Sequence, residues 1–173
     1  MIERLKKIES QQMLDLLGER DAWQQGGQRV MRLARPVGEY QLWIHRMADF
    51  GRIRGQWHPH PWPMAVHVLA GEYYQEFGYS VDFAEPEVSA KSYMQANSYY
   101  EITDKDMWHY VTPINECCYT TMLTAASWTP EVLETGLQKT SDEKPLITVS
   151  KKEAEALLDW FTAYYENYYK EQA

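Results

Sequence analysis

Three histidines of this chain have the types and spacing of metal ligands. His58 and His60 stand two residues apart in the stretch WHPHPWP at 57–63. Alternate side chains of a strand project from the same face, so both imidazoles can converge on one point, and the prolines disfavour a helix here. Two imidazoles give a divalent metal two nitrogen ligands, and a third must come from elsewhere. His109, in the segment 104–111, is the candidate.

The elements that must position these histidines are strands. After residue 27 the chain consists of short runs of β-branched and aromatic residues broken by Gly, Pro, Asn and Asp. Strands are expected near 28–34, 40–47, 55–60, 64–70, 73–78, 89–96, 98–103, 109–112 and 117–126. Many short strands without intervening helices indicate a sandwich or a barrel.

Helical patterns occur toward the two ends of the chain. Apolar residues recur at helical spacing over 2–19, and Gly26-Gly27 ends this region. A short helix is expected over 129–136 and a polar linker over 138–145. Ser150 and Glu153 then fit a capping box that opens a helix to about Lys170. Its apolar stripe is expected to pack on the β core, with a dimer contact as the alternative.

These patterns predict one domain with three parts: an N-terminal helix within 1–26 packed on a barrel, the β-barrel itself over 27–128, and a helical extension over 129–173. A chain of 173 residues is long enough to bury a core of its own.

Composition excludes several classes of partner. The net charge of −8 and the absence of a basic stripe argue against nucleic acid. No stretch approaches the roughly 20 apolar residues that span a bilayer, and the first residues do not read as a signal peptide, so no membrane partner is expected.

Cys117 and Cys118 are adjacent and point to opposite faces of a strand, which excludes a disulfide framework. A reducing, cytoplasmic location is therefore expected.

The order of these features resembles the cupin superfamily over roughly residues 38–128. The resemblance lies in His58-x-His60, the apolar strand that ends at Gly71-Glu72, and the downstream His109. The HPHPW phrase is also similar to uncharacterised cupin-like proteins. The resemblance implies a mainly β fold, a cupin-type double-stranded β-helix (jelly-roll) barrel with an N-terminal helix and a C-terminal helical extension. It also implies that His58, His60 and His109 hold a metal.

One position departs from the cupin pattern. The usual metal-binding glutamate would fall four residues after His60, where this chain has Met64. Three neutral imidazoles resemble the three-His iron site of thiol dioxygenases, and such a metal favours an anionic substrate. The Ser-His-Tyr constellation of those enzymes is not evident, and Ala65 stands where some of them carry cysteine, which argues against thiol oxidation in particular. Fe(II) is the expected metal, with Zn, Ni or Mn as alternatives.

Further side chains are expected to form a substrate site for a small molecule. They are Trp57, Trp62 and Tyr99 as aromatic walls, inward-facing Met64, Arg46 as a clamp for an anion, and His45 as a substrate contact. For each aromatic residue the alternative is packing in the core, and for His45 it is a packed histidine with satisfied hydrogen bonds. His67 is expected to point outward, as a surface or interface residue.

The sequence thus predicts a cupin-type mononuclear metal-dependent oxygenase, dioxygenase-like, that acts on a small-molecule ligand. No catalytic residue beyond the metal ligands is assigned. The alternatives are a polar histidine patch without metal, a non-catalytic small-molecule-binding or protein-interaction cupin, and a cupin isomerase or epimerase that uses His58 or His60 as a base. A homodimer is expected.

Overall fold

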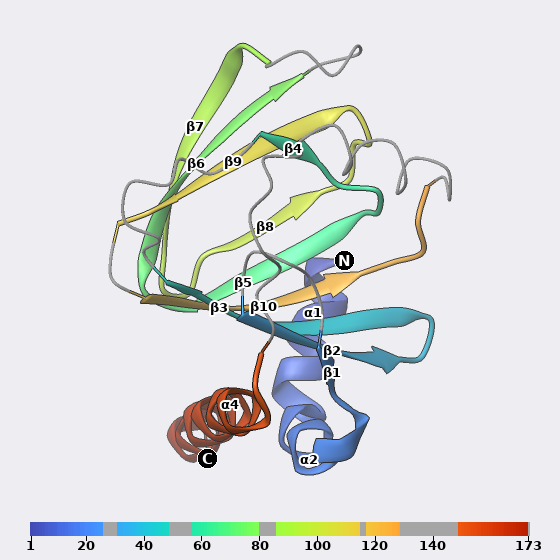
Figure 1. Cartoon of the computed structure of the whole chain (residues 1–173), viewed down its shortest axis with the longest axis vertical. Coiled ribbons are helices and arrows are strands. Elements are labelled where there is room, and N and C mark those ends of the chain that lie inside the picture. The colour runs from blue at the N-terminus through green and yellow to red at the C-terminus, as the bar shows by residue number, and fades with distance from the viewer. Residues whose placement is uncertain (26–30, 49–56, 80–85, 115–116, 129–148, 173) are drawn as a thin grey trace.

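Two antiparallel sheets face each other, and helices cover the outer side of one of them (Figure 1). This computed structural model describes residues 1–25, 31–48, 57–79, 86–114, 117–128 and 149–172. The helices are α1 (Ile2–Gln11), α2 (Met13–Gly18) and α4 (Lys151–Gln172), with a 3-10 turn η1 (Arg20–Ala22). The strands are β1 (Gln24–Gln25), β2 (Met31–Val37), β3 (Tyr40–Ala48), β4 (His58–Pro59), β5 (Met64–Ala70), β6 (Glu72–Tyr79), β7 (Val88–Gln95), β8 (Tyr99–Ile102), β9 (Met107–Pro113) and β10 (Cys117–Thr124).

The strand pairs are nested in the sequence. One sheet has the order β1-β2-β3-β10-β5-β8 and the other the order β4-β9-β6-β7. Strand β6 pairs with β7, β5 with β8, β4 with β9 and β3 with β10, all antiparallel. One long antiparallel ribbon is thus folded across two sheets, which is the double-stranded β-helix of a jelly roll. The predicted fold class is confirmed.

Strand alternation divides the core into an interior and a helix-covered side. In β5, Met64 and Val66 face the barrel interior, where they join apolar clusters with residues of β10. Ala65 and Leu69 face the other way and pack against the helices. The helices contribute the apolar stripe that closes this side, which includes Leu5, Ile8, Leu157, Leu158 and Phe161.

The turn between β5 and β6 depends on a glycine. Gly71 has φ +80, a region that L side chains rarely adopt. A Cβ at this position would also collide with the backbone carbonyl of Cys117. Only glycine therefore fits where the barrel wall turns from one sheet to the other.

The helices differ from the sequence expectation in one respect. The expected helix over 2–19 is interrupted at Gln12, whose φ of −128 is not helical, so α1 and α2 are separate. The C-terminal helix is confirmed, and Ser150 and Glu153 form the reciprocal contacts of a capping box. Gly26-Gly27, the helix expected over 129–136 and the linker over 138–145 lie outside the described residues. Within the described part of the chain, no helix is both long and apolar enough to cross a membrane.

Candidate metal centre

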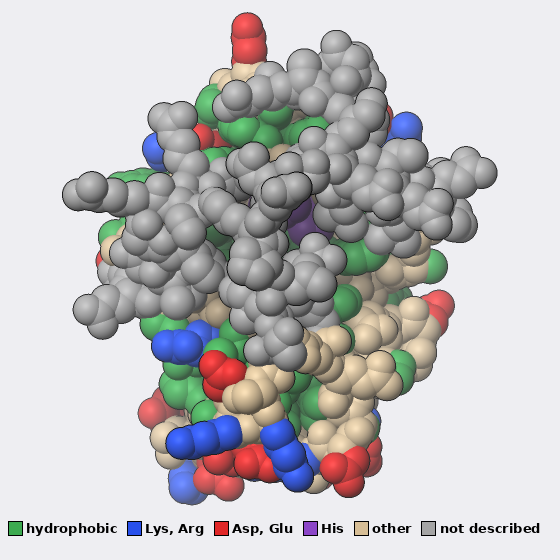
Figure 2. All heavy atoms as spheres, in the orientation of Figure 1, with side chains coloured by type: hydrophobic (Ala, Val, Ile, Leu, Met, Phe, Trp, Pro, Cys, Tyr) green, Lys and Arg blue, Asp and Glu red, His purple; other side chains and the backbone are tan. Residues whose placement is uncertain are grey.

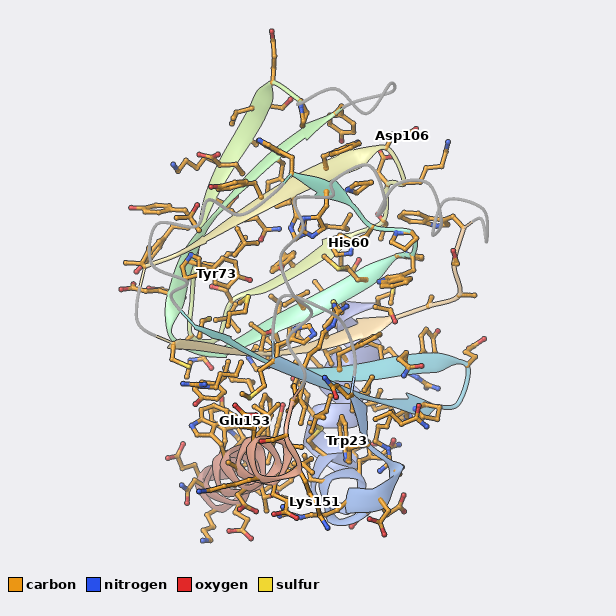
Figure 3. The ribbon with its side chains drawn as sticks, in the orientation of Figure 1. Trp23, His60, Tyr73, Asp106, Lys151 and Glu153 are labelled. Carbon is orange, nitrogen blue, oxygen red and sulfur yellow. The ribbon has the colours of Figure 1, made fainter. Side chains whose placement is uncertain are left out.

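The three predicted ligands converge inside the barrel. His58 on β4 stands directly opposite His109 on β9, so their side chains share a face, and His60 lies two residues further on. The Nε2 atom of His109 is 3.0 Å from that of His58 and 2.7 Å from that of His60. Figure 3 shows His60 between the two sheets. Strand pairing and alternation thus aim three imidazole nitrogens at one point.

The separations of these nitrogens fit one metal ion. The ligand atoms of His58, His60 and His109 all lie within 4.8 Å of one another. Two nitrogens at roughly 2.1 Å from a metal and at right angles to each other are about 3.0 Å apart. The observed 2.7 and 3.0 Å are close to that value. A set of three ligands on one side of an ion leaves positions open on its other side.

The electrostatics also suit a cation. Burial lowers the pKa of His60 well below its usual value, and the neighbouring His58, Arg32 and His45 lower it further. Burial, followed by the charges of the other two histidines, lowers the pKa of His109 in the same direction. These rings are therefore neutral near pH 7, which is the form that binds metal.

Gln75 holds the His109 ring from behind. Its side chain is fully buried, and its amide lies 2.8 Å from Nδ1 of His109. The two ends of an amide exchange by a half-turn. With its oxygen toward the ring, Gln75 accepts the Nδ1–H of His109, and Nε2 keeps the lone pair that a metal needs. This orientation also gives the amide oxygen a partner that it otherwise lacks among the described residues.

The segment that carries His60 is fastened to the chain after β10. The backbone carbonyl of Pro61 accepts hydrogen bonds from the backbone of Trp128 at 2.9 Å and from the hydroxyl of Ser127 at 2.8 Å. The carbonyl of Pro63 accepts one from Ala125 at 3.1 Å. Prolines preset the extended course of this segment, and these bonds fix where it runs.

Three of the six expected substrate-site residues do face the interior. Met64 is buried in an apolar cluster against which Trp62 packs. The Trp62 ring stacks on Trp43, with centroids 6.3 Å apart. His45 is buried with its Nδ1 3.1 Å from the Thr120 hydroxyl. The neighbouring Trp43 and His45 rings are 6.4 Å apart. Where the cupin pattern has a carboxylate, the interior has an apolar wall instead.

The other three expected residues point away from the histidines. Arg46 lies on the reverse face of β3, where its Nε is 3.1 Å from Cys117 Sγ. Tyr99 donates a hydrogen bond to Glu9 on the helix-covered side. Trp57 contacts Tyr110, which follows His109 and so faces outward. Strand phase turns each of these side chains to the outer side of the barrel wall, so the structure does not bring them to the three histidines.

The sequence patterns did not identify Gln75 and Arg32, two residues whose side chains lie in the barrel interior. Gln75 lies in a strand segment without any motif, although its phase with buried Tyr73 places it inside. Arg32 pairs in register with His45 across β2 and β3, which puts both on the inner face. Its guanidinium carbon lies 4.8 Å from the centre of the Trp43 ring. Strand alternation carried across the β2–β3 hairpin is the signal that could have found Arg32.

His67 points outward as expected, but it is not on the surface. It is buried beneath α1, and its Nδ1 is 2.9 Å from the carboxylate of Glu9. The hydroxyls of Thr121 and Tyr165 also donate to that carboxylate. The expectation of a surface histidine is therefore corrected, since the interface that it forms is with the helices of its own chain.

Figure 2 shows histidine atoms exposed on one side of the molecule, and His58 and His60 are both partly accessible.

Comparisons with known proteins find similarity only to solved structures, and at low identity. No protein-family model and no curated protein sequence matches this chain. Among solved structures, HppE in its Fe(II) form is 10% identical with a TM-score of 0.45, and the match covers 59% of this chain and 54% of that one. KdgF from Halomonas sp. is 10% identical with a TM-score of 0.44, covering 60% and 87%.

An RmlC-like cupin family protein with a double-stranded β-helix fold, from Methanocaldococcus jannaschii, is 12% identical with a TM-score of 0.41, covering 61% and 84%. The chain spans about half the length of HppE in that match. At these identities and scores no residue is carried over from the matched structures, so the site rests on its own geometry.

Proposed function

We propose that this protein is a mononuclear metal-dependent oxygenase that acts on a small molecule, with Fe(II) held by His58, His60 and His109. The observation that carries the proposal is the approach of three imidazole Nε2 atoms to 2.7 and 3.0 Å inside a jelly-roll barrel. When bound, Fe(II) supplies redox chemistry and open positions for ligands. Zn, Ni and Mn are alternative metals for the same three nitrogens.

The protein's own groups have distinct tasks in this proposal. Gln75 orients His109 through Nδ1. The apolar wall around Met64 and Trp62 excludes water from the reacting region. The Thr120 hydroxyl lies 3.1 Å from Nδ1 of His45 and can donate a hydrogen bond to it, which leaves the proton of the neutral ring on Nε2.

Metal analysis followed by oxygen uptake tests the proposal. We expect one equivalent of metal after anaerobic reconstitution with Fe(II), and oxygen consumption with small organic acids or thiols. The triple variant His58→Ala, His60→Ala, His109→Ala should lose both. His67→Gln is the matched control, because His67 is a histidine on the other side of the sheet and should keep the metal. Full metal content in the triple variant contradicts the proposal.

A binding protein without catalysis is the second candidate. It is favoured by Met64, since an apolar side chain replaces the fourth protein ligand of the cupin pattern. Stoichiometric iron with oxygen uptake supports the enzyme, whereas a folded protein that takes up no metal supports the binding module. An isomerase that uses His58 or His60 as a base is a third candidate; it would need a carboxylate partner for that ring, whereas Nε2 of His60 lies 2.7 Å from the imidazole of His109.

We further propose that the chain works in the cytoplasm as a homodimer. Exposed tyrosines on β6 and β7, which include Tyr74 and Tyr93, offer an apolar surface for a second copy. Light scattering tests the dimer, and fractionation of cells tests the location.

A further inference from the structure

A hydrogen-bonded series of buried side chains leads away from the candidate metal centre. Gln75 and Tyr73 are both fully buried and have the same phase on β6, so both point into the barrel. Figure 3 shows Tyr73 between the two sheets. The Tyr73 hydroxyl lies 3.2 Å from the hydroxyl of Tyr100 on β8, and Tyr100 packs against the apolar cluster that contains Tyr73. At the other end of the series, the Gln75 amide is 2.8 Å from Nδ1 of His109.

One end of the Gln75 amide faces two neighbours. The Gln75 side chain is hydrogen-bonded to Tyr100 as well as to His109. The other end of the amide is buried and has no partner among the described residues. The end beside Nδ1 of His109 is therefore also the end beside the Tyr100 hydroxyl. Because the far end lacks a partner in either orientation, the two neighbours decide which atom faces them.

The two tyrosine hydroxyls favour the amide oxygen. The Tyr73 hydroxyl has Tyr100 as its partner and donates its hydrogen to it. The hydrogen of Tyr100 then needs an acceptor of its own. An amide nitrogen beside Tyr100 would leave one of the two hydroxyl hydrogens buried without an acceptor, at a cost of about 1–3 kcal/mol. An amide oxygen has two lone pairs, so it accepts from Tyr100 and from His109 together.

This orientation of Gln75 selects one tautomer of His109. An oxygen that faces Nδ1 accepts a hydrogen bond only if Nδ1 carries the proton, so Nε2 keeps its lone pair. Nε2 is the atom that lies 3.0 Å from His58 and 2.7 Å from His60. The tyrosine pair therefore acts on the candidate metal centre through the amide of Gln75.

We propose that Tyr73 and Tyr100 are positioning residues of this centre, which hold the oxygen of Gln75 toward His109 and so fix the tautomer that binds metal. The benefit to metal binding rests on the proposed function. The tautomer itself is a property of the metal-free protein, so it can be measured without a metal.

NMR of the full-length, metal-free protein tests the proposal. Long-range correlations between the ring protons and the two ring nitrogens distinguish the tautomers of an imidazole, and His109→Ala identifies the signals of His109. We expect the wild type to carry the proton on Nδ1. In Tyr100→Phe the amide loses the donor that orients it, so the tautomer with the proton on Nε2 should appear. The affinity for Zn(II), measured with a chromophoric chelator, should fall about fivefold, because one orienting hydrogen bond is lost.

A second background separates positioning from a general effect on the fold. Gln75→Glu presents an oxygen in either orientation and needs no tyrosine to orient it. Tyr100→Phe should therefore weaken zinc binding in the wild type and have little effect when combined with Gln75→Glu. Tyr73→Phe should act in the same direction as Tyr100→Phe by a smaller factor, and it serves if Tyr100→Phe does not fold. Tyr165→Phe is the matched control, because it removes a buried phenol hydroxyl from the helix-covered side and should change neither the tautomer nor the zinc affinity.

Three outcomes overturn the proposal: a wild-type His109 with its proton on Nε2, a tautomer and zinc affinity that stay unchanged in both Tyr100→Phe and Tyr73→Phe, or equal losses from Tyr100→Phe with and without Gln75→Glu. A wild type that has the expected tautomer but takes up no zinc contradicts the metal centre and not the positioning role. Zinc uptake with an unchanged tautomer and affinity in both tyrosine variants contradicts the positioning role and not the metal centre.

Discussion

The barrel interior and the helix-covered side of the six-stranded sheet both bury histidine, but with different partners. On the helix-covered side, His67 meets the carboxylate of Glu9, which also accepts hydrogen bonds from Thr121, Tyr99 and Tyr165. In the interior, the imidazoles of the candidate centre face one another. On the helix-covered side, four side chains of the chain converge on one carboxylate, although Nε2 of His67 has no partner among the described residues. In the interior, the three imidazoles point at a shared space.

This difference separates a structural network from a binding site. The Glu9 network joins α1 and α4 to the sheet, since its members come from α1, β5, β8, β10 and α4. A network whose members hydrogen-bond to one shared carboxylate contributes rigidity. Three imidazoles whose nitrogens converge contribute little to one another and gain from a cation. Stability should therefore depend on the first cluster and ligand affinity on the second.

The largest expected effect is the loss of metal affinity on removal of a ligand. His109→Ala should lower the affinity for Zn(II) or Fe(II) by more than about a hundredfold, because even residues behind the ligands typically account for about 10–100-fold. Its thermal unfolding in the metal-free state should change little by comparison. Competition with a chromophoric chelator measures the affinity. An affinity within tenfold of the wild type would contradict the assignment of His109.

The next effect is on stability and leaves the metal untouched. Glu9→Ala should lower the free energy of unfolding by about 3–5 kcal/mol, because it leaves several buried donors unsatisfied. Denaturant unfolding measures it. Glu3→Ala, on the exposed face of the same helix, should cost much less. Loss of metal affinity in Glu9→Ala with unchanged stability would contradict the structural role given to the Glu9 network.

Lowering the pH should reduce the free energy of unfolding of the metal-free protein, because His45 is buried in the barrel interior. Burial, followed by the charge of Arg32, lowers the pKa of His45 from 6.5 to about 3. Between these values the unfolded chain binds a proton that the folded one does not, so stability is full above about pH 6.5 and falls toward pH 3. The free energy of unfolding of the wild type should fall between pH 7 and pH 4. The same fall should be less steep in His45→Gln. Equal slopes would show that His45 does not carry the effect.

The smallest expected effect concerns Gln75. Gln75→Met keeps the volume but cannot orient Nδ1 of His109, and metal affinity should fall about 10–100-fold. Gln75→Glu supplies a carboxylate acceptor and should restore most of it. The d–d spectrum of the Co(II)-loaded protein should change in Gln75→Met, whereas a purely structural role would leave it unaltered in the folded fraction.

Strand phase decided how far the sequence could predict this site. The triad was predictable because His58 and His60 share a phase within one strand, and the resemblance named His109 as their partner. Arg46 and Trp57 were assigned wrongly although the same rule excludes them, since each neighbours an inward-facing histidine. Residues that are adjacent in a strand point to opposite sides of the barrel wall, so nearness to a ligand in the sequence does not bring a side chain into the site.

Other features depend on contacts between distant parts of the chain. The burial of His67 requires Glu9, which lies 58 residues away on a helix. Helical periodicity predicts that α1 packs on a sheet, but not on which strand or which side chain. Arg32 and Gln75 carry no motif, and only the pairing of their strands places them beside the histidines. Local pattern thus predicts the elements and their faces, while the pairing of particular residues needs the assembled sheets.

The nested strand pairs also have a consequence for the order of folding. Among the nested pairs, the β6–β7 hairpin closes the shortest stretch of chain, and each further pair, β5–β8, β4–β9 and β3–β10, encloses the one before it. Because closing a longer loop costs more entropy, we expect the ribbon to zip outward from that hairpin. His58 and His109 then meet only in the third step. In a nascent chain the candidate metal centre would therefore form late, after most of the ribbon had left the ribosome.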